Sequence, residues 1–147
     1  MATEPQPGKL EPAVARAVRR ALPGADPARA VVVGRGFDVV AWRVPASDGD
    51  WTLRVPRLDD ARPTIAAQHC LGQRLAAAGL PVPRDPTLLR DASGEVIAGL
   101  YRYADGHRAE GSGRSQRSRL ARELARLLSQ LHALTDPASD FARIIQH

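Results

Sequence analysis

The spacing of hydrophobic residues along the chain predicts three helices. In residues 11–22, 65–78 and 117–134, apolar side chains recur at intervals of three or four, which places them on one face of a helix. Pro63 can open the second helix, since proline is accepted at the first helical position. Gly72 inside that helix costs about 1 kcal/mol relative to alanine, which indicates a close packing contact there.

Short runs rich in β-branched and apolar residues predict five strands between these helices. They are residues 30–33, 39–44, 51–55, 86–89 and 96–103. The pair Asp48-Gly49 separates the second run from the third and favours a tight antiparallel hairpin. Residues 1–8 are polar, and we expect them to form a disordered lead.

The composition is that of a soluble globular protein. The 147 residues are 44% hydrophobic and 25% charged, which is enough for one domain with a core. No apolar run approaches the length of a membrane span, and the N-terminus lacks the apolar stretch of a secretory signal. We therefore expect a cytoplasmic protein without a membrane partner.

The net charge of +5 suggests nucleic-acid binding, but other features argue against it. Lys9 is the only lysine, and the many arginines are spread along the chain rather than massed in one block. Aromatic residues make up only 4%, so the side chains that stack on bases are missing. No nucleic-acid partner is expected.

The cysteine and histidine content argues against a disulfide or a metal site. Cys70 is the only cysteine, so no internal disulfide can form. The four histidines do not have metal-ligand spacing, and we interpret them as packed or solvated side chains. They are His69, His107, His132 and His147.

The third predicted strand carries the sharpest candidate for ligand binding. Alternation places Thr52 and Arg54 on one face of the strand and Leu53 and Val55 on the other. Arg54 therefore faces either solvent or a ligand, and periodicity alone leaves both open.

A series of short motifs resembles the aminoglycoside and macrolide phosphotransferase family, in the order in which that family has them. GRGFDVVAWRV (34–44) resembles its phosphate-loop hairpin, and DGDWTLRVPR (48–57) resembles its third strand, most closely the macrolide 2′-phosphotransferase version. GLPVPR (79–84) is similar to the connection after the helix, YRYADG (101–106) to the hinge, and LARLLSQLHAL (124–134) to the first large-lobe helix. The resemblance extends from about residue 12 to residue 134.

The resemblance implies an α+β fold, the small lobe of the kinase fold. This lobe has a five-stranded antiparallel sheet and one packed helix, joined here by an N-terminal helix and the first helix of a truncated large lobe. It divides the chain into a tail and helix (1–27), a nucleotide-binding lobe (28–104) and a hinge exit with an incomplete helical lobe (105–147). The implied nucleotide is ATP or GTP, with Mg²⁺ only in a full-length relative.

The resemblance assigns two segments that would bind the nucleotide through their backbone. Gly34 and Gly36 lack a Cβ, so backbone amides there can approach phosphates, although a plain hairpin also explains two glycines. Arg35 either adds charge near the phosphates or points into solvent. At the hinge, backbone groups would bind the adenine edge, with Tyr101 at the back of the pocket. The same residues are also consistent with an amphipathic edge strand. These hinge residues are Arg102, Tyr103 and Ala104.

The resemblance also assigns two side chains. Arg54 takes the place of the lysine that pairs with the phosphates in most kinases, which favours phosphate contact over a solvent-facing position. Gln68 takes the place of the glutamate that holds this cation. A glutamine oxygen can accept a hydrogen bond from Arg54 but brings no charge. If this helix aligns with the family pattern in another register, Gln68 is a surface residue instead.

The groups that carry out phosphoryl transfer in this fold are not found in the sequence. The reaction uses a His-x-Asp loop with a downstream Asn and then a metal-binding Asp, and no histidine here has an aspartate at that spacing. We therefore assign no catalytic residue and no metal ligand, and expect a truncated chain that is inactive alone. A full-length relative would phosphorylate a hydroxyl of a macrolide, aminoglycoside or similar small molecule.

An alternative interpretation is a catalytically inactive, kinase-like binding module. The third predicted helix carries one apolar stripe that needs a partner surface, which a second copy or another protein would supply. The members of this leucine stripe are Leu120, Leu124, Leu127, Leu128 and Leu131.

Overall fold

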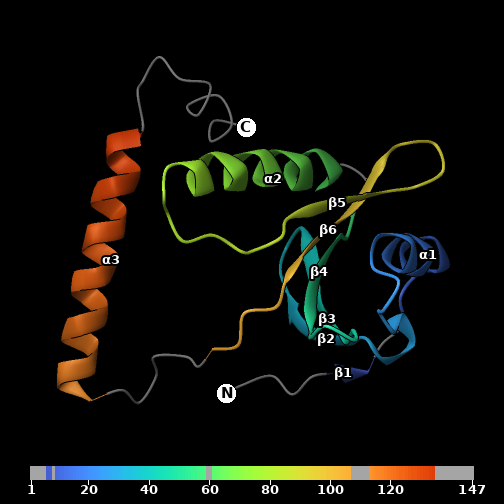
Figure 1. Ribbon diagram of the computed structural model, residues 1–147, viewed down its shortest axis with the longest axis horizontal. Coiled ribbons are helices and arrows are strands. Elements are labelled where there is room, and N and C mark those ends of the chain that lie inside the picture. Colours follow the sequence, from blue (N-terminus) through green and yellow to red (C-terminus); the bar gives the residue numbers. More distant parts are fainter. Residues whose placement is uncertain (1–5, 8, 59–60, 107–112, 135–147) are drawn as a thin grey trace.

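The computed structural model describes residues 6–7, 9–58, 61–106 and 113–134, and there the chain forms one antiparallel sheet and three helices (Figure 1). In chain order the elements are β1 (Gln6–Pro7), α1 (Pro12–Ala21), a 3₁₀ turn (Pro27–Arg29), β2 (Val31–Arg35), β3 (Val39–Val44), β4 (Trp51–Pro56), α2 (Arg62–Ala77), β5 (Thr87–Arg90), β6 (Val96–Arg102) and α3 (Arg114–Leu134). The α+β fold is confirmed and is consistent with the kinase-like small lobe. The domain boundaries stay a prediction.

The strands are ordered β1-β2-β3-β4-β6-β5, and all neighbours are antiparallel. All five predicted strands are present, and the two-residue β1 extends the edge. In β1, Gln6 and Pro7 pair with Val32 and Val31 of β2. The expected disordered lead is wrong for these two residues, because an edge strand such as β2 offers unpaired backbone groups to any adjacent extended segment.

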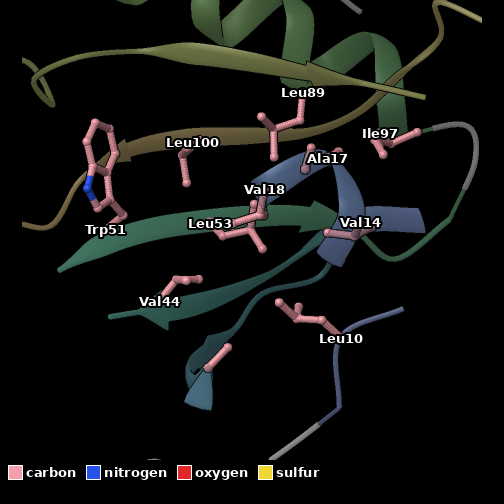
Figure 2. Packing of buried hydrophobic residues seen from close by; sticks show 12 residues of the cluster. Leu10, Val14, Ala17, Val18, Val44, Trp51, Leu53, Leu89, Ile97 and Leu100 are labelled. Carbon is pink, nitrogen blue, oxygen red and sulfur yellow. The ribbon is translucent and has the colours of Figure 1, made fainter. Parts of the chain in front are cut away.

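Helix α1 covers one face of the sheet and builds the main core with it. Pro12 opens the helix at a position where proline needs no hydrogen-bond partner. Figure 2 shows Val18 of α1 beside Leu53 of β4. Leu53 and Val18 are fully buried in this cluster, together with Leu100 of β6.

Helix α2 lies against the opposite side, where it contacts β6, β4 and β5. Ile65 anchors its first turns and is 1% exposed. The close packing expected at Gly72 is wrong, since a Cβ built there meets nothing within 4 Å. Gly72 faces a cavity instead of a neighbouring element.

The glycine turn between β2 and β3 is shorter than the sequence predicts. A bulge between Val32 and Gly34 shifts the register and lets β2 continue through Arg35. The turn itself is residues 36–38, closed by the Gly36 N–H, which donates to the Val39 carbonyl at 2.8 Å. Gly34 and Arg35 are therefore strand residues.

Helix α3 stands apart from the sheet in Figure 1. Leu120, Leu124 and Leu128 are 44%, 58% and 44% exposed. None of the helices in the described ranges is both long and apolar enough to cross a membrane. Residues 107–112 and the chain after Leu134, with His107 and His147, lie outside the described residues.

Replacing Leu53 with alanine tests the assignment of the core. Leu53 is fully buried at the centre of the sheet, so Leu53→Ala is expected to lower the free energy of unfolding by about 2–5 kcal/mol. Leu58→Ala is the matched control, because Leu58 is 61% exposed and its loss is expected to cost less than about 0.5 kcal/mol. Urea unfolding followed by tryptophan fluorescence measures both. Equal costs for the two variants would contradict this core.

Candidate functional site

A cavity of about 460 Å³ lies between α2, strands β4 and β6, and the segment from Pro81 to Pro86. Its walls include the apolar side chains of Leu75 and Val82. Four of the eight residues predicted to bind the nucleotide line it, namely Arg54, Gln68, Arg102 and Ala104. Residues from β4, from α2 and from the end of β6 thus line the same cavity.

Arg54 lies on the sheet face that looks toward α2, opposite the buried Leu53. Its cross-strand neighbours are Ala41 on β3 and Gly99 on β6, so a small residue lies beside Arg54 on each neighbouring strand. Among the described residues, no carboxylate pairs with Arg54 and no side-chain hydrogen bond holds it. Its positive charge therefore faces the cavity without a protein counter-ion from this part of the chain.

Tyr101 forms the wall next to Arg54. A Cβ on Gly99 would lie 2.9 Å from the Tyr101 hydroxyl, so glycine at this position leaves room for the ring to lie over the strand. Burial raises the pKa of the Tyr101 phenol above its ordinary value, and the nearby Arg54 charge partly offsets this. Tyr101 is therefore a neutral hydroxyl beside an arginine.

Two polar atoms of α2 are buried without a partner. Gln68 Oε1 and His69 Nδ1 have no hydrogen-bond partner among the described residues, and both side chains line the cavity. The predicted hydrogen bond from Arg54 to Gln68 is thus not formed, although both residues border the same space. The Gln68 oxygen is an acceptor, whereas His69 Nδ1 accepts or donates according to its tautomer. Buried polar atoms are rarely left unpaired, so this wall has polar groups that a ligand can pair.

Two of the three backbone N–H groups of the predicted hinge already donate hydrogen bonds within the protein. The Arg102 N–H donates to the Arg84 carbonyl at 2.9 Å, and the Tyr103 N–H donates to the Asp50 carbonyl at 3.0 Å. The Ala104 N–H has no backbone acceptor in the described ranges. Of the three predicted hinge residues, only Ala104 therefore has an N–H left for a base.

The Arg102 side chain fixes the hinge to the β3–β4 hairpin, a role that the sequence does not reveal. Its guanidinium bonds the Asp48 carboxylate and the Asp48 carbonyl, both at 2.9 Å, and contacts Asp85 at 3.4 Å. It also stacks 4.2 Å from the centre of the Trp51 ring. Trp51 in turn donates its indole N–H to Asp48 at 3.1 Å. These bonds lower the pKa of Asp48, the Trp51 bond most and the Arg102 bond next.

Tyr103 and the glycine segment lie outside the main cavity. Tyr103 lines a neighbouring cavity of about 470 Å³ beside the segment from Pro81 to Arg84, and Arg43 stacks 4.8 Å from its ring centre. Gly34 pairs with Ala41, which pairs with Arg54, so two strand spacings separate Gly34 from Arg54 by about 10 Å. The structure therefore brings together four of the eight predicted residues, and sets apart Tyr103 and the glycine segment Gly34, Arg35 and Gly36.

Within the described ranges, no cluster of three or more histidine, cysteine or acidic side chains is arranged to hold a metal ion. The site is instead cationic at Arg54 and apolar along its walls, with two unpaired polar atoms on α2. This chemistry suits an organic anion that has a flat apolar part.

Comparison with known proteins adds a family to this geometry. The family model described as "Phosphotransferase enzyme family" matches residues 29–147. That range covers the whole sheet from β2 onward, both helices that follow and every residue of the candidate site. A search of curated proteins found no match.

Replacing Trp51 with phenylalanine tests the hinge network. Trp51→Phe keeps an aromatic ring under Arg102 but removes the indole donor, so the pKa of Asp48 is expected to rise toward its ordinary value. A pH titration of the carboxyl signals by NMR measures this. Asp91 is the internal control, because Ser93 lowers the pKa of Asp91 independently of Trp51.

The sign of the pH dependence follows from the same shift. The stability that a lowered pKa confers is present above the pKa of the unfolded chain and is lost as pH falls through the folded one. The variant should therefore show a weaker loss of stability on acidification. An Asp48 pKa that does not change in Trp51→Phe would contradict the network.

Proposed function

The chain belongs to the phosphotransferase enzyme family, and we propose that it forms the ATP- or GTP-binding lobe of a small-molecule kinase. The observation that carries the proposal is the cavity beside Arg54. An arginine without a carboxylate partner in the described ranges faces a largely apolar space of about 460 Å³, a size typical of small-molecule sites. A guanidinium can bind phosphate oxygens with two parallel hydrogen bonds, which suits the α- and β-phosphates of a nucleotide.

The apolar walls of the cavity fit a purine base. Leu75, Val82 and Tyr101 offer apolar surface to a flat ring. The Ala104 N–H is unused by the described backbone, so it is a donor for the ring edge. The network around Arg102 holds this segment in place before any ligand arrives, which reduces the entropy lost on binding.

The residues present support binding and orientation of a nucleotide. Arg54 neutralises phosphate charge, the unpaired Gln68 oxygen is an acceptor for a donor group of the nucleotide, and the hinge holds the base. The sequence has no His-x-Asp motif to orient an acceptor hydroxyl, and the described residues offer no carboxylate cluster for Mg²⁺. We therefore assign no residue here to the chemical step, and derive no step through a metal.

The acceptor in the proposed reaction is a hydroxyl group of an aminoglycoside, a macrolide or a similar small molecule. This part of the proposal rests on the motif at 48–57, which is most similar to the third strand of macrolide 2′-phosphotransferases. A cytoplasmic location likewise stays a prediction from composition.

Titration calorimetry with Mg-ATP tests the role of Arg54. Arg54→Ala is expected to weaken binding roughly 10- to 100-fold, because it removes charge-assisted hydrogen bonds to phosphate. Arg54→Lys should lose less, since it keeps the charge. Arg19→Ala is the matched control, because Arg19 lies exposed on α1 and takes no part in the cavity. Unchanged affinity in Arg54→Ala would refute the phosphate role.

The exposed face of α3 favours a second candidate, a protein-binding module that pairs with another copy of the chain. Leu120, Leu124 and Leu128 are spaced four residues apart and form one exposed row on α3. Leu127 and Leu131 lie on the same stripe and are half-buried. A row of this kind is the usual seam of paired helices.

Sedimentation velocity at several concentrations tests self-association. The chain is expected to associate as concentration rises, and Leu124→Asp should hold it as a monomer because a charge in the seam must be desolvated. Arg119→Gln changes an exposed polar residue of the same helix and should behave like the unaltered chain. A monomer at all concentrations would exclude this second candidate.

A further inference from the structure

Arg57, just after β4, binds all three carbonyls of the turn between β2 and β3. Its backbone N–H donates to the Asp38 carbonyl at 2.8 Å. Its guanidinium Nη1 donates to the Gly36 carbonyl at 3.3 Å and to the Phe37 carbonyl at 3.5 Å. The side-chain bonds are long and individually weak, but together the three bonds hold successive peptide groups of the turn.

Because the peptide bond is planar, holding these carbonyls also fixes the direction of the N–H groups that follow them. A peptide group is planar and trans, so each N–H points away from the carbonyl that precedes it. With the Gly36 and Phe37 carbonyls held by Arg57, the N–H groups of Phe37 and Asp38 point to the other side of the turn. Neither N–H has an acceptor among the described residues. Two successive free donors of this kind form an anion-binding concavity.

Alternation along β4 indicates which side that is. Leu53 and Val55 point toward α1, and Arg57 continues this series, whereas Arg54 points toward the main cavity. Arg57 also borders a small separate cavity with Glu11, Val14 and Val55, on the α1 side of the sheet. Its side-chain bonds therefore draw the Gly36 and Phe37 carbonyls toward α1 and leave the two amides facing the Arg54 side.

We propose that Arg57 is a positioning residue, which holds the Gly36–Asp38 turn so that the Phe37 and Asp38 amides bind the β- or γ-phosphate of the nucleotide. Arg57 itself stays on the far side of the sheet and does not touch the ligand. The inference rests on the proposed nucleotide-binding function, and it adds a residue that acts on phosphate through the backbone of the turn.

A ligand series that differs only in phosphate number separates positioning from general stability. Calorimetric affinities are measured for adenosine, AMP, ADP and ATP, the last two with Mg²⁺, on the unaltered chain and on Arg57→Ala. Arg57→Ala is expected to bind ATP roughly tenfold more weakly and adenosine equally well, because only phosphate contacts depend on the turn. Arg57→Gln, which keeps a donor but no charge, should recover part of the ATP affinity. Arg19→Ala serves as the control for loss of one positive charge.

NMR gives a second readout on the same variants. In the unaltered chain, ATP but not adenosine should shift the amide signals of Phe37 and Asp38, and this shift should be lost in Arg57→Ala. Equal ATP affinity in Arg57→Ala and the unaltered chain would overturn the role of Arg57 while leaving the nucleotide site standing. Equal weakening for adenosine and ATP would overturn it as well, since the effect would then be one on the whole lobe.

If the proposed nucleotide binding itself is wrong, the unaltered chain gives a different result. If the unaltered chain binds neither ATP nor adenosine, the proposed nucleotide site is wrong, and the phosphate role of the turn is refuted with it.

Discussion

The burial of Leu53 fixes the position of every other group in the site. Leu53 is fully enclosed between the sheet and α1, and strand alternation then forces Arg54 to the opposite face. Because β4 is hydrogen-bonded to strands on both sides, it cannot shift by one residue without exposing this core. Packing of apolar side chains on one face thereby places a cation on the other.

The same strand anchors both backbone segments of the proposed nucleotide site. At its start, Trp51 and the adjacent Asp48 hold the Arg102 side chain and with it the hinge. At its end, Arg57 holds the glycine turn. Arg54 lies between these two anchors. One rigid strand can therefore set the spacing of hinge, cation and turn, which is what preorganised binding requires.

Much of the fold was accessible to sequence reasoning, because strands and helices follow local periodicity. The site was accessible only in part. Alternation defines two faces for Arg54, but the choice between them depends on α1, which packs from far along the chain. The pairing of Arg102 with Asp48 spans 54 residues and that of Arg57 with Gly36 spans 21. Local sequence patterns do not predict contacts over such separations. The open space at Gly72 likewise depends on how α2 meets the sheet.

In the proposed site, Arg54, the hinge and the turn all contact the same bound nucleotide. A crystal structure of the chain with a non-hydrolysable ATP analogue tests this most directly. We expect the base to lie against the Ala104 N–H and the phosphates to lie within hydrogen-bonding distance of Arg54. An analogue bound elsewhere, or bound in this cavity with its phosphates directed away from Arg54, would contradict it.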